Sequence, residues 1–201
     1  MPAAHHHDLT IPDHKTLRAE AERRVKDEVG AIARPDDRFE RACEIVQQAD
    51  LEIAAHAEER NQAALSLWFY DGVRGLDKVL GILPNAYNEL RRLALHGDRK
   101  ATINPGGDLK ARMTAEERRA AAKKAGVLHI NDAADRLPSL STTVSVAAAR
   151  RKAAMPFLQD SALALTEEPY EWTTDRIAEL GDVTPKYARD VKNAAKRRRG
   201  H

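Results

Sequence analysis

The sequence predicts an all-α protein of several helices, arranged as two helical units joined by a linker that contains glycine and proline. Three observations lead to this prediction. Apolar residues recur three and four positions apart over most of the 201-residue chain. Aromatic residues make up only 4% and charged residues 32%, which favours helices with thin interfaces over a thick sheet core. Glycine and proline lie between the periodic segments, where helices usually end.

The first residues of the chain, 1–13, are expected to form a disordered tail. The three histidines at positions 5–7 could bind a metal ion weakly. A flexible trio has no surrounding side chains to fix it, so an incidental polar tail is the better interpretation and no metal site is predicted. Residues 14–33 then carry a helical pattern with charges of both signs, which Ala33-Arg34-Pro35 interrupts.

The longest predicted helix covers residues 37–59, and two acidic residues, Asp36 and Asp37, suit its positive end. Its apolar residues form a heptad-like stripe about two and a half repeats long. The stripe consists of Phe39, Ala42, Val46, Ala49 and Ile53. Two interpretations stay open: a homodimer through helix 37–59, or packing of this helix on the rest of the same chain.

Composition excludes several classes of protein. Cys43 is the single cysteine, so an intrachain disulfide and Cys-rich zinc spacing are both excluded, and its place on the apolar stripe indicates a small core residue. No run of 18 apolar residues predicts a membrane span, and the first residues do not resemble a secretory signal. We therefore expect a cytoplasmic protein with no membrane partner.

Enzyme chemistry finds little support in the motifs. The sequence contains no phosphate-binding loop, no His-Glu-x-x-His, no dinucleotide-binding glycine pattern and no Gly-x-Ser-x-Gly. Paired acidic residues lie on charged helical faces, where ion pairs near solvent are the ordinary explanation. We predict no catalytic residue and no cofactor.

Residues 61–96 are predicted to form three short helices separated by two tight breaks. The first helix ends at Asp71-Gly72, and the second covers Leu76 to Leu80 and stops at Gly81. Pro84 suits the first turn of the third helix because its missing N–H costs nothing there. Gly97 ends that helix.

This layout resembles the helix-turn-helix of bacterial DNA-binding regulators, over about a fifth of the chain. The residues that carry the resemblance are Leu76, Leu80, Gly81, Ile82, Tyr87 and Leu90. Asp77 departs from the family pattern, which usually has a small residue there. The resemblance implies that the third helix enters a major groove. It implies DNA contacts from Leu83, Asn85, Asn88, Glu89, Arg91 and Arg92, with the asparagines suited to adenine and Arg92 to guanine or phosphate.

Residues 98–113 are predicted to be the linker, because glycine, proline and asparagine cluster there and apolar periodicity is lost. Thr114 and Glu117 form a capping-box pattern for a helix that Gly126 closes. Further on, Pro138 and Pro156 are each expected to stop a helix, with residues 139–143 as a loop between them.

A second helix-turn-helix-like stretch covers residues 173–195. Thr173 or Thr174 can cap its first helix, Gly181-Asp182 makes the turn with Val183 as the apolar plug, and Thr184-Pro185 opens the next helix. The resemblance implies DNA contacts from Thr184, Lys186, Tyr187 and Arg189. It also implies backbone contacts from Lys196, Arg197, Arg198 and Arg199.

Charge is distributed unevenly near the C-terminal end. Residues 186–199 carry a net charge of +6, whereas residues 160–182 carry −6. A basic helix of this kind would neutralise DNA phosphates and give binding a steep salt dependence. A solubilising tail, or a tail that folds back on the acidic segment, is the alternative.

Together these patterns predict an N-terminal helical domain at 14–97 and a C-terminal helical domain at 114–201 with a basic tail at 196–201. The predicted function is sequence-specific binding of double-stranded DNA, as a transcriptional regulator or a plasmid or phage maintenance factor. The alternative is a helical protein–protein adaptor that docks through helix 37–59 and does not read DNA sequence.

Overall fold

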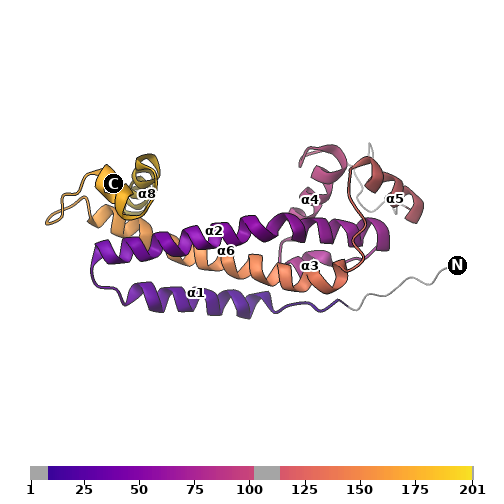
Figure 1. Cartoon of the computed structure of the whole chain (residues 1–201), viewed down its shortest axis with the longest axis horizontal. Coiled ribbons are helices and arrows are strands. Elements are labelled where there is room, and N and C mark those ends of the chain that lie inside the picture. The colour runs from indigo at the N-terminus through magenta and orange to yellow at the C-terminus, as the bar shows by residue number, and fades with distance from the viewer. Residues whose placement is uncertain (1–8, 102–113, 201) are drawn as a thin grey trace. The chain divides into compact units, whose positions relative to one another are not determined.

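The computed structural model describes residues 9–101 and 114–200, and every regular element within them is helical (Figure 1). The all-α prediction is therefore confirmed. The histidines at 5–7 and most of the predicted linker lie outside the described residues. The elements are α1 (His14–Gly30), α2 (Pro35–Ser66), a π-helical turn (Leu67–Asp71), α3 (Leu76–Leu80), α4 (Pro84–His96), α5 (Ala115–Lys124), α6 (Ala133–Ala164), α7 (Thr174–Leu180) and α8 (Pro185–Arg199). None of the described helices is long and apolar enough to cross a bilayer.

The chain forms two compact units, and each unit combines segments that are far apart in the sequence. The first unit contains the described residues up to His14 and those from Ala55 to Val144. The second unit contains Lys15–Ala54 and the described residues from Ser145 onward. This division differs from the predicted domains 14–97 and 114–201, because the two 32-residue helices α2 and α6 each contribute to both units.

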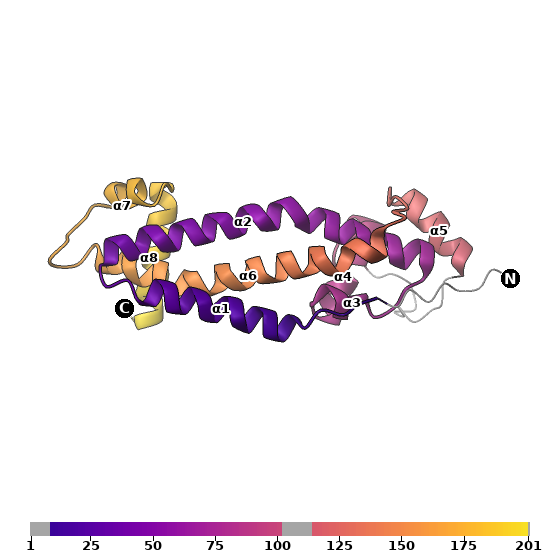
Figure 2. The same cartoon turned by 60° about the horizontal axis from the view of Figure 1, so that its bottom comes forward.

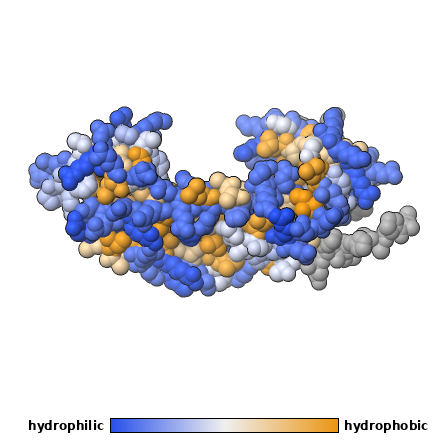
Figure 3. All heavy atoms as spheres, in the orientation of Figure 1, coloured by the Kyte–Doolittle hydropathy of each residue, from blue (hydrophilic) through white to orange (hydrophobic). Residues whose placement is uncertain are grey.

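The second unit is organised around three helices whose segments lie side by side, namely α1, the first part of α2 and the second part of α6 (Figures 1 and 2). Its core contains Val29 of α1, Phe39 of α2 and Leu158 of α6, and Ile177 and Val191 add α7 and α8 to it. Hydrophilic side chains, with some hydrophobic ones between them, cover the visible face of α7 and α8 (Figure 3). The core thus holds α7 and α8 on one end of the three-helix layer.

The apolar stripe of the long helix packs into the core of the second unit. Phe39, Ala42, Val46 and Ala49 are all buried, and Ile53 is half-buried. Packing within the chain therefore accounts for the stripe, as one of the two interpretations of its pattern expected. These four side chains are not accessible to a second copy.

The first unit packs α3 and α4 against the ends of α2 and α6. Leu76 and Leu80 of α3, Tyr87 of α4 and Leu137 of α6 share one buried cluster with the end of α2. A second cluster joins Phe69 and α5, and the hydroxyl of Tyr70 donates a hydrogen bond of 2.9 Å to the carbonyl of Val127 there.

The prediction of a helix ending at residue 59 was wrong, because α2 continues to Ser66. The first of the three short helices expected in 61–96 is thus the end of α2, followed by the π-helical turn that Gly72 closes with φ +69°. No glycine or proline separates Glu59 from Ala63, and Ala63 and Ala64 are buried. Propensity and burial therefore both favour continuing the helix.

The predicted stops at Pro138 and Pro156, and the loop at 139–143, were also wrong. Helix α6 runs through all of these positions. A proline inside a helix costs about 3 kcal/mol because it removes one backbone hydrogen bond and crowds the preceding turn. Buried residues beside the prolines, such as Leu137, Ala154 and Leu158, offset that cost by packing in the two cores.

The predicted helix ends at the glycines and the capping box are confirmed. Thr114 accepts a hydrogen bond from the backbone N–H of Glu117, and the Glu117 side chain accepts one from the backbone N–H of Thr114. Gly81 and Gly97 close α3 and α4 with φ of +64° and +69°, the left-handed region that glycine enters at little cost.

Candidate nucleic-acid interface

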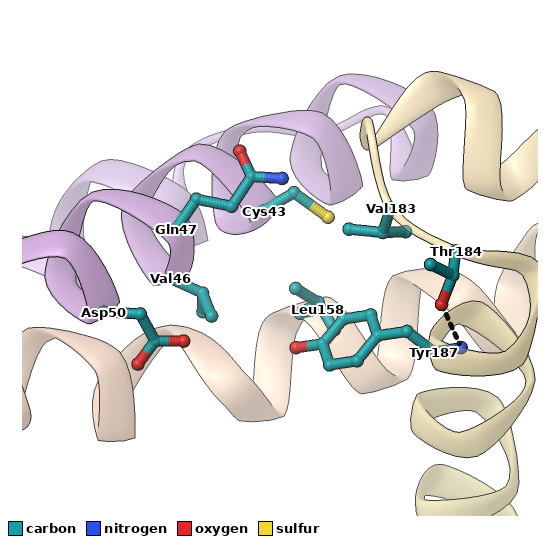
Figure 4. Close-up of a pocket in the computed structure, with 8 residues that line it drawn as sticks. All are labelled: Cys43, Val46, Gln47, Asp50, Leu158, Val183, Thr184 and Tyr187. Carbon is teal, nitrogen blue, oxygen red and sulfur yellow. Dashed lines mark hydrogen bonds between the residues drawn. The ribbon is translucent and has the colours of Figure 1, made fainter. Parts of the chain in front are cut away.

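Helices α7 and α8 form a pair joined by a tight turn in the second unit. The hydroxyl of Thr173 caps α7 by accepting from the N–H of Arg176 at 3.3 Å. The N–H of Val183 then donates to the carbonyl of Ala178 at 3.0 Å, which returns the chain toward α7. The hydroxyl of Thr184 caps α8 by accepting from the N–H of Tyr187 at 3.2 Å (Figure 4).

The turn between α7 and α8 is held against α2. The side-chain amide of Gln47 donates to the carbonyls of Gly181 at 2.9 Å and Asp182 at 3.2 Å. Gly181 is buried, and a Cβ at this position would lie 2.6 Å from Sγ of Cys43 and 2.7 Å from a ring carbon of Phe39. The start of α8 is therefore fixed by contacts with the core.

Helix α8 has an apolar face and an opposite basic face. Ala188, Val191 and Ala195 are buried, at spacings of three and four residues. Lys186, Arg189 and Arg197 are exposed and lie on the opposite side by helical periodicity, where the exposed Asp190 offsets one of the three positive charges. We call these three exposed cations the α8 basic stripe.

The last cations of α8 divide into two groups. Arg198 forms an ion pair of 2.6 Å with Asp160 and donates to the amide oxygen of Gln159 at 2.9 Å, and Arg199 lies 3.3 Å from the same carboxylate. These two arginines fold back on α6, as one alternative expected for the tail. Lys196 and Arg197 are exposed.

Thr184 and Tyr187, two of the predicted DNA contacts, have structural roles. The hydroxyl oxygen of Thr184 already accepts the hydrogen bond that caps α8. Tyr187 is half-buried against the core, with its hydroxyl 3.9 Å from Sδ of Met155, and burial raises the pKa of this phenol. Their positions favour setting the angle of α8 over contacting a base.

Replacing Thr184 by alanine is expected to lower the free energy of unfolding by about 1 kcal/mol, the usual cost of losing an N-cap. Urea denaturation followed by circular dichroism measures it. Thr184→Ser keeps the capping oxygen and should retain most of the stability. Equal losses in the two variants would contradict the capping role.

Helices α3 and α4 form the corresponding pair in the first unit. The N–H of Ile82 donates to the carbonyl of Asp77 at 3.0 Å, and Tyr87 is buried against α3. The ring of His14 covers Gly81, and its Nε2 lies 2.8 Å from the carbonyl oxygen of Val79. The side chain of Asp77, which departs from the family pattern, is half-buried.

Arg91 of α4 is committed to the fold of the first unit. Its guanidinium carbon lies 4.7 Å from the ring centre of Trp68 and 4.9 Å from that of Tyr87. It also donates a hydrogen bond to the side-chain oxygen of Asn88. Burial lowers the pKa of Arg91. Two of the predicted DNA contacts, Asn88 and Arg91, are therefore hydrogen-bonded to each other, and Arg91 also lies over two aromatic rings.

The remaining candidates of α4 present a mixed surface. Leu83, Asn85 and Glu89 are exposed, and Arg92 is half-buried. Glu89 and Arg92 cancel in charge, so this face lacks the positive excess of the α8 basic stripe. Of the two helix pairs, α7–α8 offers the stronger attraction for phosphates.

Sequence reasoning missed three residues that position these helices. Gln47 holds the α7–α8 turn, Asp160 binds the tail, and Arg176 lies with its guanidinium carbon 3.8 Å from the ring centre of Trp172. The four-residue spacing of Trp172 and Arg176 is a signal that could have indicated their contact. Gln47 and Asp160 act across the fold, and no local pattern indicates such contacts.

The described residues contain no group of three or more side chains arranged to hold a metal ion. Burial raises the pKa of the Cys43 thiol to about 12, which makes a thiolate nucleophile unfavourable at neutral pH. Comparison with protein families, curated proteins and solved structures gives no match for this chain.

Proposed function

We propose that this protein binds double-stranded DNA in a sequence-specific manner and that α8 is the helix that approaches the groove. The observation that carries the proposal is the α8 basic stripe. It consists of three exposed cations opposite a buried face, on a helix whose start is fixed by a capped, tightly packed turn. Anchoring of this kind allows a helix to present side chains to a groove in one orientation.

Phosphate contact and base reading would fall to different residues. Lys196 and Arg197, near the end of α8, are exposed and suit the DNA backbone, which positions a protein without reading sequence. Lys186 and Arg189, near its start, suit guanine edges in a major groove. Arg198 and Arg199 would contribute only if their ion pairs with Asp160 opened.

Helix α4 is the second candidate surface. Asn85 suits the edge of adenine and Glu89 accepts from cytosine, whereas Arg92 suits guanine or phosphate. Because the face is close to neutral, we assign it a role in selectivity and assign most of the affinity to α8.

A transcriptional regulator or a plasmid or phage maintenance factor of the bacterial nucleoid fits this function. Paired half-sites would call for a homodimer, and its interface would have to use a surface other than the buried stripe of α2. The adaptor alternative uses helix 37–59 as its docking surface. Because the side chains of Phe39, Ala42, Val46 and Ala49 are buried in the chain's own core, we do not favour the adaptor.

The test is selection from a random duplex pool by the immobilised full chain. We expect enrichment of a common sequence, which then serves as the selected duplex for affinity measurements. Retention of duplexes without an enriched sequence would contradict sequence-specific binding, and no retention at low salt would contradict DNA binding altogether.

Replacing Arg92 by alanine is expected to weaken binding to the selected duplex about ten-fold more than binding to random duplex, since a lost base contact costs about 1–3 kcal/mol. Fluorescence anisotropy measures both affinities. Arg119→Ala, at an exposed cation of α5, is the control. Equal weakening of binding to both duplexes would show that Arg92 contacts a phosphate and does not read a base.

A further inference from the structure

A pocket of about 290 Å³ lies in the second unit beside the start of α8 (Figure 4). Its walls come from α2, α6, the end of the α7–α8 turn and the first turn of α8. Val46, Leu158 and Val183 supply an apolar lining, together with the ring of Tyr187. The volume is at the small end of the range of ligand pockets, which suits a molecule of one or two rings.

Two polar side chains on α2, Asp50 and Gln47, offer hydrogen-bond acceptors to the pocket. Asp50 contributes a carboxylate, of which one oxygen accepts from Nε of Arg151 at 2.7 Å. The side-chain nitrogen of Gln47 donates to the α7–α8 turn, which leaves its oxygen as the group that can accept from a ligand. The hydroxyl end of Tyr187 points toward the side of the pocket that carries Val46 and Asp50 (Figure 4).

These features define one class of ligand. An apolar lining with an aromatic wall favours a flat aromatic body. Asp50 is exposed at the pocket's edge and Gln47 is half-buried, so their oxygens are accessible acceptors that favour a ligand with an N–H or O–H donor. The ion pair with Arg151 already compensates the charge of Asp50, so a neutral donor suits the site better than a cation.

We propose that this pocket is a binding site for a small neutral aromatic molecule that carries one N–H or O–H donor. Binding does not require the DNA-binding function. Where that function holds, the ligand would contact Val183 and Thr184, the two residues between the turn and α8. Its binding would thereby change the orientation of α8 and of the α8 basic stripe.

Indole and indene test the site, because the two bicyclic molecules have nearly the same shape and only indole carries an N–H. We expect indole to shift the backbone amide signals of Val183 and Thr184 in a saturable manner in NMR titration of the full chain. Indene should bind at least five-fold more weakly. Absence of saturable shifts with indole at millimolar concentration would overturn the site, and equal affinity for both molecules would overturn the donor requirement.

Two variants connect the binding to the pocket. Val183→Phe fills the pocket and should abolish the indole shifts, whereas Leu51→Phe, at an exposed position of α2 next to Asp50, should not change them. Asp50→Ala removes an acceptor from the rim without adding bulk, so it should reduce the preference for indole over indene. Unchanged indole affinity in a folded Val183→Phe variant, or an unchanged preference in Asp50→Ala, would overturn the proposal.

Discussion

Replacing Gly181 by alanine is expected to lower the free energy of unfolding by about 2–3 kcal/mol, a typical cost of overpacking a core. The φ of Gly181 is −93°, an angle that alanine adopts readily, so backbone strain does not explain the loss. The cause is space: the new Cβ would lie 2.6 Å from Sγ of Cys43 and 2.7 Å from a ring carbon of Phe39. Urea denaturation followed by circular dichroism measures the change.

Gly30→Ala is the matched control for this prediction. It lies in the same unit at the last position of α1, and a Cβ there would meet the ring of Phe157 at an ordinary 3.8 Å. We expect little change or a gain of about 0.5 kcal/mol, because alanine loses less conformational entropy.

A double-mutant cycle isolates the contact between Cys43 and Gly181. Cys43→Ala removes the nearest atom, so Gly181→Ala should cost less in the Cys43→Ala background than in the natural chain. The ring of Phe39 remains, so relief is expected to be partial. A Gly181→Ala variant as stable as the natural chain would contradict the close packing of the α7–α8 turn.

Replacing Lys186, Arg189 and Arg197 together by glutamine is expected to remove most of the affinity for DNA. On random duplex, where no base sequence is read, all three cations are expected to lie against phosphates. Each neutralised phosphate contributes about 0.9 to the slope of log Kobs against log salt, so the slope should fall by about 2.7. The three side chains are exposed, so the free energy of unfolding should stay within about 0.5 kcal/mol. Fluorescence anisotropy across a salt series measures the slope.

The control for charge alone replaces three exposed cations of α5, Arg119, Lys123 and Lys124, by glutamine. Net charge changes by the same amount, but a helix outside the proposed interface is altered. We expect its slope to match that of the natural chain. Equal slopes for the two triple variants would show that net charge, and not the α8 basic stripe, governs binding.

Local chemistry explains what the sequence predicted well. The break at Gly81, the caps at Thr114 and Thr184, and proline at the first turns of α4 and α8 all depend on residues within a few positions of one another. A short stretch of sequence contains all the residues that form such a helix start or stop, so these features can be predicted without the fold.

Long-range packing explains what the sequence did not predict. Pro138 and Pro156 are local stop signals, yet contacts made by Leu137 and Leu158 keep α6 continuous. The division into units likewise depends on where α2 and α6 meet other segments, which helical periodicity does not specify.

The candidate site shows the same limit. Exposure of Lys186, Arg189 and Arg197 follows from helical periodicity and the position of the apolar residues of α8. By contrast, the cation–π contact between Arg91 and Trp68 depends on the path of the chain between α2 and α4. A pattern of charges can therefore propose contacts, but only the fold separates free cations from engaged ones.

Binding of the full natural chain to random duplex DNA is the property that the α8 basic stripe most directly requires. Anisotropy of a labelled duplex, measured between about 50 and 200 mM salt, gives Kobs over the range where counterion release is strong. We expect log Kobs to fall linearly with log salt, with a slope of about −3 or steeper. Absence of binding at about 50 mM salt, or binding that does not depend on salt, would contradict a nucleic-acid contact through α8.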